Sequence, residues 1–205
     1  MVTGSASMRR LVEKRDLLLK STGIELSNIG VDEIPDEICD PPRLQTLRIT
    51  DSKVSKLPKG ISRCESLEEL CLSGCRFETL DISTEQLQRL VLIDISNNRF
   101  RQIPGCLTTM RALVHLNAAE NAIEEISAEV VGLQSLEELI LTDNKLSVIS
   151  EVVCKLPRLS MLDVTGNNVA RVPRCDFPAL QNLFIDAENL APGELEWLHG
   201  KRFWK

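Results

Sequence analysis

Three segments of this chain decide its fold: LVLIDISNNRFRQIP (90–104), LEELILTDNKLSVIS (136–150) and LSMLDVTGNNVARVP (159–173). They share the pattern L-x-x-L-x-L-x-x-N-x-L-x-x-L-P, in which other apolar residues replace some of the leucines. Residues alternate in direction along a strand, so L-x-L predicts a short strand with one face buried.

The pattern recurs with a constant period of 23 residues. Its first leucine falls at Leu44, Leu67, Leu90, Leu113, Leu136 and Leu159. A degenerate copy begins at Ser21, and a shortened copy begins at Leu180. Such regular self-similarity predicts a solenoid. We therefore expect seven repeats and a partial eighth over residues 21–190.

The strands of successive repeats should pair side by side, because each repeat can bury its apolar face only against its neighbours. The predicted fold is an α/β solenoid with a curved parallel sheet on its concave face and short helices or 3-10 turns on its convex face. We expect strands centred near residues 24–26, 47–49, 70–72, 93–95, 116–118, 139–141, 162–164 and 183–185. Leu70 and Ile93 should lie on adjacent strands.

These repeats resemble the leucine-rich-repeat family, in its typical 23-residue class. The L-P step and the I-x-x-L ending make them similar to the intracellular Ras-suppressor and Scribble type. The resemblance implies a module that binds another protein, such as a small GTPase, phosphatase, kinase or ubiquitin-ligase subunit. It carries over no binding residue, because the shared motif is structural.

Position 9 of each repeat predicts a ladder of buried side-chain amides: Asn98, Asn121, Asn144 and Asn167. Each amide can satisfy backbone groups in its own loop and in the next. Ile29, Ser52 and Cys75 occupy the same position in earlier repeats, where a hydroxyl or thiol makes fewer bonds than an amide. We expect the N-terminal half to be the less stable half.

Both ends of the solenoid need a cap. Residues 1–20 contain four leucines among charges from residue 11 onward and suit a capping helix. Residues 191–205 suit a second helix with Leu195, Trp197 and Leu198. This second segment could instead be a docking tail, since Phe203 and Trp204 follow it.

Composition restricts the class of protein. The net charge of −6 disfavours nucleic acid as a partner. The sequence contains neither an apolar run long enough for a membrane span nor a secretory signal. An odd number of cysteines (seven), with no C-x-x-C pair, predicts reduced thiols and no zinc site. We expect a cytoplasmic protein, with a nuclear location as the alternative.

Motifs of catalysis are absent from the sequence: it has no H-E-x-x-H, no P-loop and no G-x-G-x-x-G. We expect neither an enzyme nor a bound cofactor. Two alternatives remain: a recognition subunit or fragment of an enzyme complex such as a ubiquitin ligase or phosphatase, and, remotely, a cysteine-dependent enzyme.

The favoured function is partner binding on the concave sheet by an adaptor or scaffold, monomeric on its own. Acids dominate that face, with Arg48 and His115 as exceptions, while position 10 forms a basic rim with Lys53, Arg76, Arg99 and Lys145. A partner with a basic surface is therefore expected. The predicted partner-binding residues are Leu92, Asp94, His115, Asn117, Glu120, Glu138, Ile140, Asp143, Met161, Asp163 and Phe184.

Overall fold

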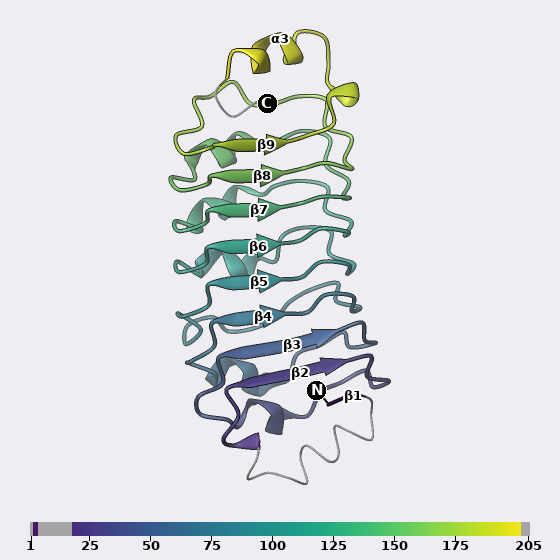
Figure 1. Cartoon of the computed structure of the whole chain (residues 1–205), viewed down its shortest axis with the longest axis vertical. Coiled ribbons are helices and arrows are strands. Elements are labelled where there is room, and N and C mark those ends of the chain that lie inside the picture. Colours follow the sequence, from purple (N-terminus) through teal and green to yellow (C-terminus); the bar gives the residue numbers. More distant parts are fainter. Residues whose placement is uncertain (1, 4–17, 202–205) are drawn as a thin grey trace.

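The computed structural model describes residues 2–3 and 18–201. All strands in this part of the chain form one parallel sheet, and their order in space follows their order in sequence (Figure 1). The strands are β1 (Val2–Thr3), β2 (Gly23–Ser27), β3 (Thr46–Thr50), β4 (Glu69–Cys71), β5 (Leu92–Asp94), β6 (His115–Asn117), β7 (Glu138–Ile140), β8 (Met161–Asp163) and β9 (Asn182–Phe184).

The strand register confirms the solenoid. Leu70 on β4 pairs with Ile93 on β5, and each following pair is shifted by one repeat. Strands β2 to β9 are the eight that the repeats predict, although β4 to β9 are centred one residue earlier than expected. Strand β1 was not predicted, because the residues around Val2 lack the repeat pattern; it pairs with Leu26 and Ser27 of β2.

Short 3-10 helices lie behind the sheet in Figure 1. They are η1 (Asp36–Cys39), η2 (Lys59–Arg63), η3 (Gly105–Thr109), η4 (Ala128–Gly132) and η5 (Glu151–Lys155), whereas η6 (Ala187–Asn189) follows β9 at the edge where the strands end. The repeat that begins at Leu67 has no helix between β4 and β5. The repeat that begins at Leu159 likewise has none between β8 and β9, so the column of helices is interrupted twice.

The core fills the space between the sheet and these helices. It consists mainly of leucine, isoleucine and valine, as the low aromatic content predicts. Phe77 and Phe100, at position 11 of consecutive repeats, are fully buried, and their ring centroids are 6.5 Å apart. Aromatic side chains therefore contribute to this core more than their number suggests.

The predicted asparagine ladder is present. The carbonyl oxygen of the Asn121 side chain accepts the Phe100 N–H, and its amide donates to the carbonyl oxygens of Ile95, Ala118 and Ala119. Asn98, Asn144 and Asn167 repeat this arrangement. One detail of the prediction was wrong: each amide reaches back to the preceding repeat and not forward to the next. The reason is geometric, since position 9 lies beside the strand and the position-11 amide of the repeat before it.

Position 8 of every full repeat has a left-handed backbone. The residues are Asn28, Asp51, Gly74, Asn97, Glu120, Asp143 and Gly166, all with positive φ. Glycine, asparagine and aspartate adopt this conformation at the lowest cost, which explains six of the seven. Glu120, with φ of 52°, adopts this conformation at a higher energetic cost, because its side chain is longer.

The C-terminal helix α3 (Glu194–His199) lies beyond β9 (Figure 1). Its Leu198 is fully buried in the common core, and Trp197 packs against it. The proposed N-terminal capping helix falls mostly outside the described residues, although Leu18 is buried. Phe203 and Trp204 also lie outside them. No helix in the described part of the chain is long and apolar enough to cross a membrane.

Candidate functional site

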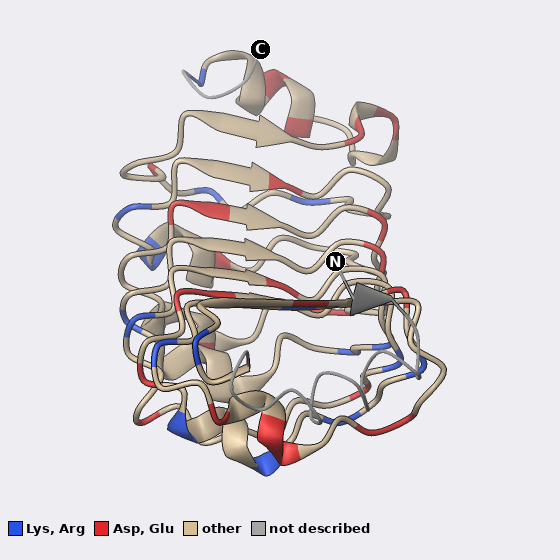
Figure 2. Ribbon diagram, turned by 60° about the horizontal axis from the view of Figure 1, so that its bottom comes forward, with Lys and Arg blue, Asp and Glu red and all other residues tan. Residues whose placement is uncertain are grey.

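The strand register places nine of the eleven predicted partner-binding residues in two rows on the exposed side of the sheet. Position 3 gives one row, which runs Leu92, His115, Glu138, Met161. Position 5 gives the other, which runs Asp94, Asn117, Ile140, Asp163, Phe184. We call these nine residues the sheet-face rows. Figure 2 shows Asp and Glu on several of the strands.

The carboxylates in the position-5 row are held by their own loops. Asp94 Oδ1 accepts the Ser96 N–H at 2.9 Å and the Ser96 hydroxyl at 2.6 Å. Asp163 accepts the same two groups from Thr165, at 3.0 and 2.7 Å. These bonds fix the side chains on rigid backbone, so a partner would lose little entropy in ordering them. Sequence reasoning missed this role of Ser96 and Thr165, although Asp-x-Ser or Asp-x-Thr at positions 5–7 was its signal.

Asn117 occupies the same position between the two aspartates. Its Oδ1 accepts the Ala119 N–H at 3.1 Å. The row therefore tolerates an amide in place of the carboxylate without losing the bond to its loop.

The position-3 row contains a hydrogen-bonded pair of side chains that the sequence did not predict. His115 Nδ1 lies 2.8 Å from Glu138 Oε2, and both side chains are about two-fifths exposed (40% and 42%). Nearer the N-terminus, Arg48 pairs with Glu69 on the neighbouring strand. Both basic groups of the sheet are thus matched to acids. The remaining free carboxylate charge lies mainly in the position-5 row.

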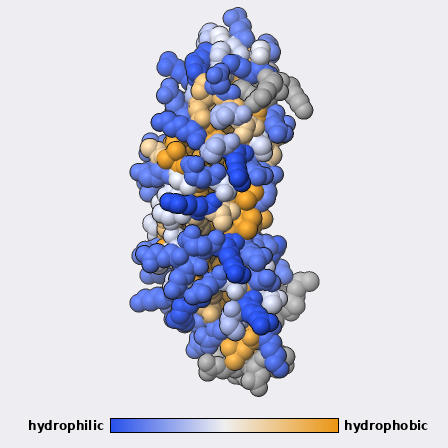
Figure 3. Space-filling view, turned by 90° about the vertical axis from the view of Figure 1, so that its left-hand side faces the viewer, coloured by the Kyte–Doolittle hydropathy of each residue, from blue (hydrophilic) through white to orange (hydrophobic). Residues whose placement is uncertain are grey.

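Apolar side chains lie between these charges. Ile140 and Met161 are half-buried, and Phe184 is 46% exposed. Leu92 is also half-buried, beside Val91, which is 38% exposed. Figure 3, which shows the edge at which the strands begin, is mostly hydrophilic with separate hydrophobic patches. The sheet face thus offers apolar contacts within a charged surround.

The other two predicted residues, Glu120 and Asp143, lie off the rows. Both are exposed at position 8, in the loop where the strand has ended. A Cβ atom on Gly166 would lie only 2.1 Å from Asp143 Oδ1, so the Asp143 carboxylate packs against the Gly166 backbone. The structure therefore brings nine of the eleven residues together on the strands and places these two at the adjoining edge.

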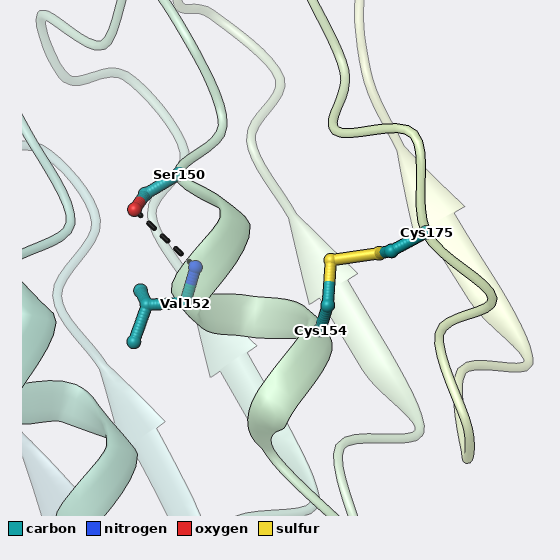
Figure 4. Close-up of a disulfide and its surroundings, with 4 residues drawn as sticks. All are labelled: Ser150, Val152, Cys154 and Cys175. Carbon is teal, nitrogen blue, oxygen red and sulfur yellow. Dashed lines mark hydrogen bonds between the residues drawn. A yellow bond between two sulfur atoms is a disulfide. The ribbon is translucent and has the colours of Figure 1, made fainter.

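The cysteines required one correction. Cys154 of η5 and Cys175 of the following repeat form a disulfide, with Cα atoms 6.2 Å apart (Figure 4). The prediction of reduced thiols was wrong for this pair. A separation of 21 residues is nearly one repeat, which places the two residues on adjacent turns of the solenoid. The usual C-x-x-C criterion does not detect such a pair.

The other thiols do not have the properties of a nucleophile. Burial raises the pKa of Cys71 and Cys106, and it raises the pKa of Cys75 to about 11. A hydrogen bond from Cys39 lowers the pKa of Cys64, but Cys64 is buried. An activated cysteine combines a low pKa with exposure, and none of the described free thiols does so. No group of three or more candidate metal ligands is found among the described residues.

Comparison with known proteins gives related folds. The sequence profile of the leucine rich repeat family matches residues 119–169. The leucine-rich-repeat domain of the type III effector XopL superposes with a TM-score of 0.78 at 22% identity, covering 97% of this chain and 71% of that one. A leucine-rich-repeat protein of Leptospira interrogans gives a TM-score of 0.73 at 23% identity. No curated protein matches the sequence.

A plant receptor ectodomain is also similar. The ectodomain of the receptor kinase GASSHO1/SCHENGEN3 from Arabidopsis thaliana, solved with CASPARIAN STRIP INTEGRITY FACTOR 2, has a TM-score of 0.64 at 27% identity over 81% of this chain. This chain spans about half (52%) of the Leptospira protein and 20% of the receptor ectodomain. The period, the strand register and these superpositions agree, and the chain has the fold of a leucine-rich-repeat solenoid.

Proposed function

We propose that this chain is a non-catalytic protein-interaction module that binds a partner through the sheet-face rows between β5 and β9. The observation that carries the proposal is the arrangement of Ile140, Met161 and Phe184 among the loop-anchored carboxylates of Asp94 and Asp163. Apolar anchors surrounded by charges are typical of binding hot spots. The receptor structure solved with CASPARIAN STRIP INTEGRITY FACTOR 2 supports a binding role for this fold.

The partner should carry a basic surface. Two carboxylates on a rigid strand row attract cations over about one Debye length, roughly 10 Å at 0.1 M salt. The expected complex therefore associates more slowly as salt is raised. We also propose that the chain is monomeric and acts as an adaptor of the Ras-suppressor and Scribble type.

The resemblance to the Ras-suppressor and Scribble type favours a cytoplasmic location, whereas the disulfide favours an oxidising compartment, and the redox state of the cysteines distinguishes the two. The Cys154–Cys175 disulfide speaks against a reducing compartment, where such bonds are rare. If the protein resides in the cytoplasm, cells lysed directly into an alkylating reagent should yield a chain in which the reagent has modified both Cys154 and Cys175. Recovery of the disulfide would assign it to an oxidising compartment.

The decisive experiment compares partner capture by three forms of the chain. The first is the unchanged protein, the second is Ile140→Ser with Met161→Ser, and the third is Glu151→Lys as control. Glu151 is exposed in η5, on the other side of the molecule from the sheet-face rows. Proteins captured by the first and third forms but lost from the second support the proposal. Loss with Glu151→Lys alone would place binding on the helical side.

A further inference from the structure

A hollow opens at the edge where the strands end, on the N-terminal repeats. Its volume is about 750 Å³, and its walls are residues 53–59 after β3 and residues 76–82 after β4, with Asp32 and Arg99 at its ends. A second hollow of about 510 Å³ shares Lys53, Arg76 and Arg99 with the first. We call the two together the basic groove. It includes the segment after β4, which belongs to one of the two repeats that lack a 3-10 helix.

The charge of this groove is opposite to that of the chain. Its larger hollow is lined by five cationic side chains and three carboxylates. Within the described residues, Arg99 pairs with Glu78 at 3.8 Å, whereas Lys53, Lys56 and Arg76 form no ion pair. The side chains of these three residues are exposed. Unpaired cations around a hollow, on a chain of net charge −6, form a site for an anion.

The cations are also regularly spaced. Lys53, Arg76 and Arg99 occupy position 10 of three successive repeats, so they follow the strand spacing of about 4.8 Å and span roughly 10 Å. In an extended peptide, alternate side chains lie on one side at intervals of about 6.7 Å. Two acidic side chains at alternate positions, about 6.7 Å apart, would therefore fit within the column.

We propose that the basic groove binds a short acidic segment of a protein, with its anionic side chains facing Lys53, Arg76 and Arg99. Carboxylate and phosphate groups share the required chemistry, because both accept hydrogen bonds from guanidinium and ammonium groups. A protein segment is favoured over nucleic acid. The column is only about 10 Å long, and the exposed carboxylates of Asp51 and Glu78 beside it would repel a continuous phosphate backbone.

The test uses the full chain and fluorescent peptides in an anisotropy titration. One peptide alternates aspartate with serine, a second has phosphoserine in place of the aspartates, and a third has asparagine there. The test variant is Lys53→Glu with Arg76→Glu. The control is Lys145→Glu, which changes an exposed residue at the same repeat position. Its neighbours at position 10 are Ala122 and Asn168, so Lys145 has no cationic neighbour at that position.

The proposal expects the aspartate or phosphoserine peptide to bind, and the comparison between them identifies the preferred anion. The double variant should weaken binding at least about tenfold, and Lys145→Glu should change it less than about twofold. Thermal melts of both variants should match the unchanged chain, since all three positions are exposed.

Three results would overturn the proposal. The first is that neither acidic peptide binds better than the asparagine peptide. The second is an equal loss with Lys145→Glu, which would indicate diffuse attraction. The third is that a single-stranded oligonucleotide binds the groove in preference to both peptides. Sedimentation of the chain alone adds a further check, because self-association that is abolished by the double variant would make a second copy the occupant.

Discussion

Replacement of one rung of the asparagine ladder gives the sharpest test of how this solenoid is held together. Asn121→Ala removes the acceptor for the Phe100 N–H at 3.0 Å and the donors to three carbonyl oxygens at 3.0 to 3.2 Å. The amide has only two hydrogens, so it supplies about three bonds in total, each contributing about 1 kcal/mol. We expect a loss of about 3 kcal/mol in the free energy of unfolding.

Ser52→Ala is the comparison at the same repeat position. The Ser52 hydroxyl accepts the Ile29 N–H at 3.0 Å and donates to the Thr50 carbonyl oxygen at 2.7 Å. Two bonds predict a loss of about 2 kcal/mol, roughly 1 kcal/mol less than Asn121→Ala. Asn168→Ala is the control, because this asparagine is exposed and its side chain should contribute within about 0.5 kcal/mol.

Urea melts of the three variants, with the slope m held common, measure these differences through their midpoints. In a thermal melt, the 1 kcal/mol difference corresponds to about 2–4 °C for a chain of this size. An equal or larger shift for Ser52→Ala would refute the view that the number of backbone partners determines the stability of each rung. A large shift of the urea midpoint for Asn168→Ala would show that the loss of stability does not come from the ladder bonds.

Three further predictions concern other parts of the chain. Cys175→Ser should lower stability by about 3 kcal/mol, because the disulfide closes a loop of 21 residues; a reducing agent should lower the melting temperature of the unchanged chain and leave that of the variant unaltered. Glu120→Asn should raise stability by roughly 0.5–1 kcal/mol, since asparagine tolerates φ near 52° better than glutamate; an unchanged urea midpoint would contradict this. Asp94→Asn with Asp163→Asn should keep the bond from each loop N–H, as Asn117 does, and should slow partner association while weakening its salt dependence; stopped-flow binding measures both, and an unaltered salt dependence would show that these charges do not steer the partner.

The repeat period determined most of the fold in advance. Leucines spaced by 23 residues can be buried together only if the strands stack in register, so the eight repeat strands followed from the sequence. Strand β1 did not, because a two-residue edge strand is formed by backbone pairing with β2 and needs no side-chain pattern. The Cys154–Cys175 bond was missed for a related reason, since it joins two repeats and its spacing carries no local motif.

The candidate site was predictable to the level of which residues share a face. The alternation of a strand places positions 3 and 5 together, and the register confirms both rows. The pairing of His115 with Glu138 was not predicted, because it depends on side-chain rotamers across two strands. The anchoring of Asp94 by Ser96 was equally local and was overlooked, because carboxylates were considered as charges and not as acceptors for their own loops.

Each ladder asparagine bonds to the preceding repeat, so the two ends of the solenoid are not equivalent. Asn144 satisfies Ile123 and Ala118 of the repeat before it, and Asn167 does the same for Leu146 and Leu141. A repeat is therefore completed only by its successor. Both kinds of deletion break the backbone pairing between adjacent strands, but their effects on the ladder differ. Deleting repeats from the C-terminal end would leave position 6 and position 11 of the new last repeat without their asparagine, whereas deletion from the N-terminal end would leave the first remaining asparagine without its partners in the preceding repeat. The N-terminus emerges first from the ribosome. Each repeat could therefore form its ladder hydrogen bonds only after the next repeat has been synthesised.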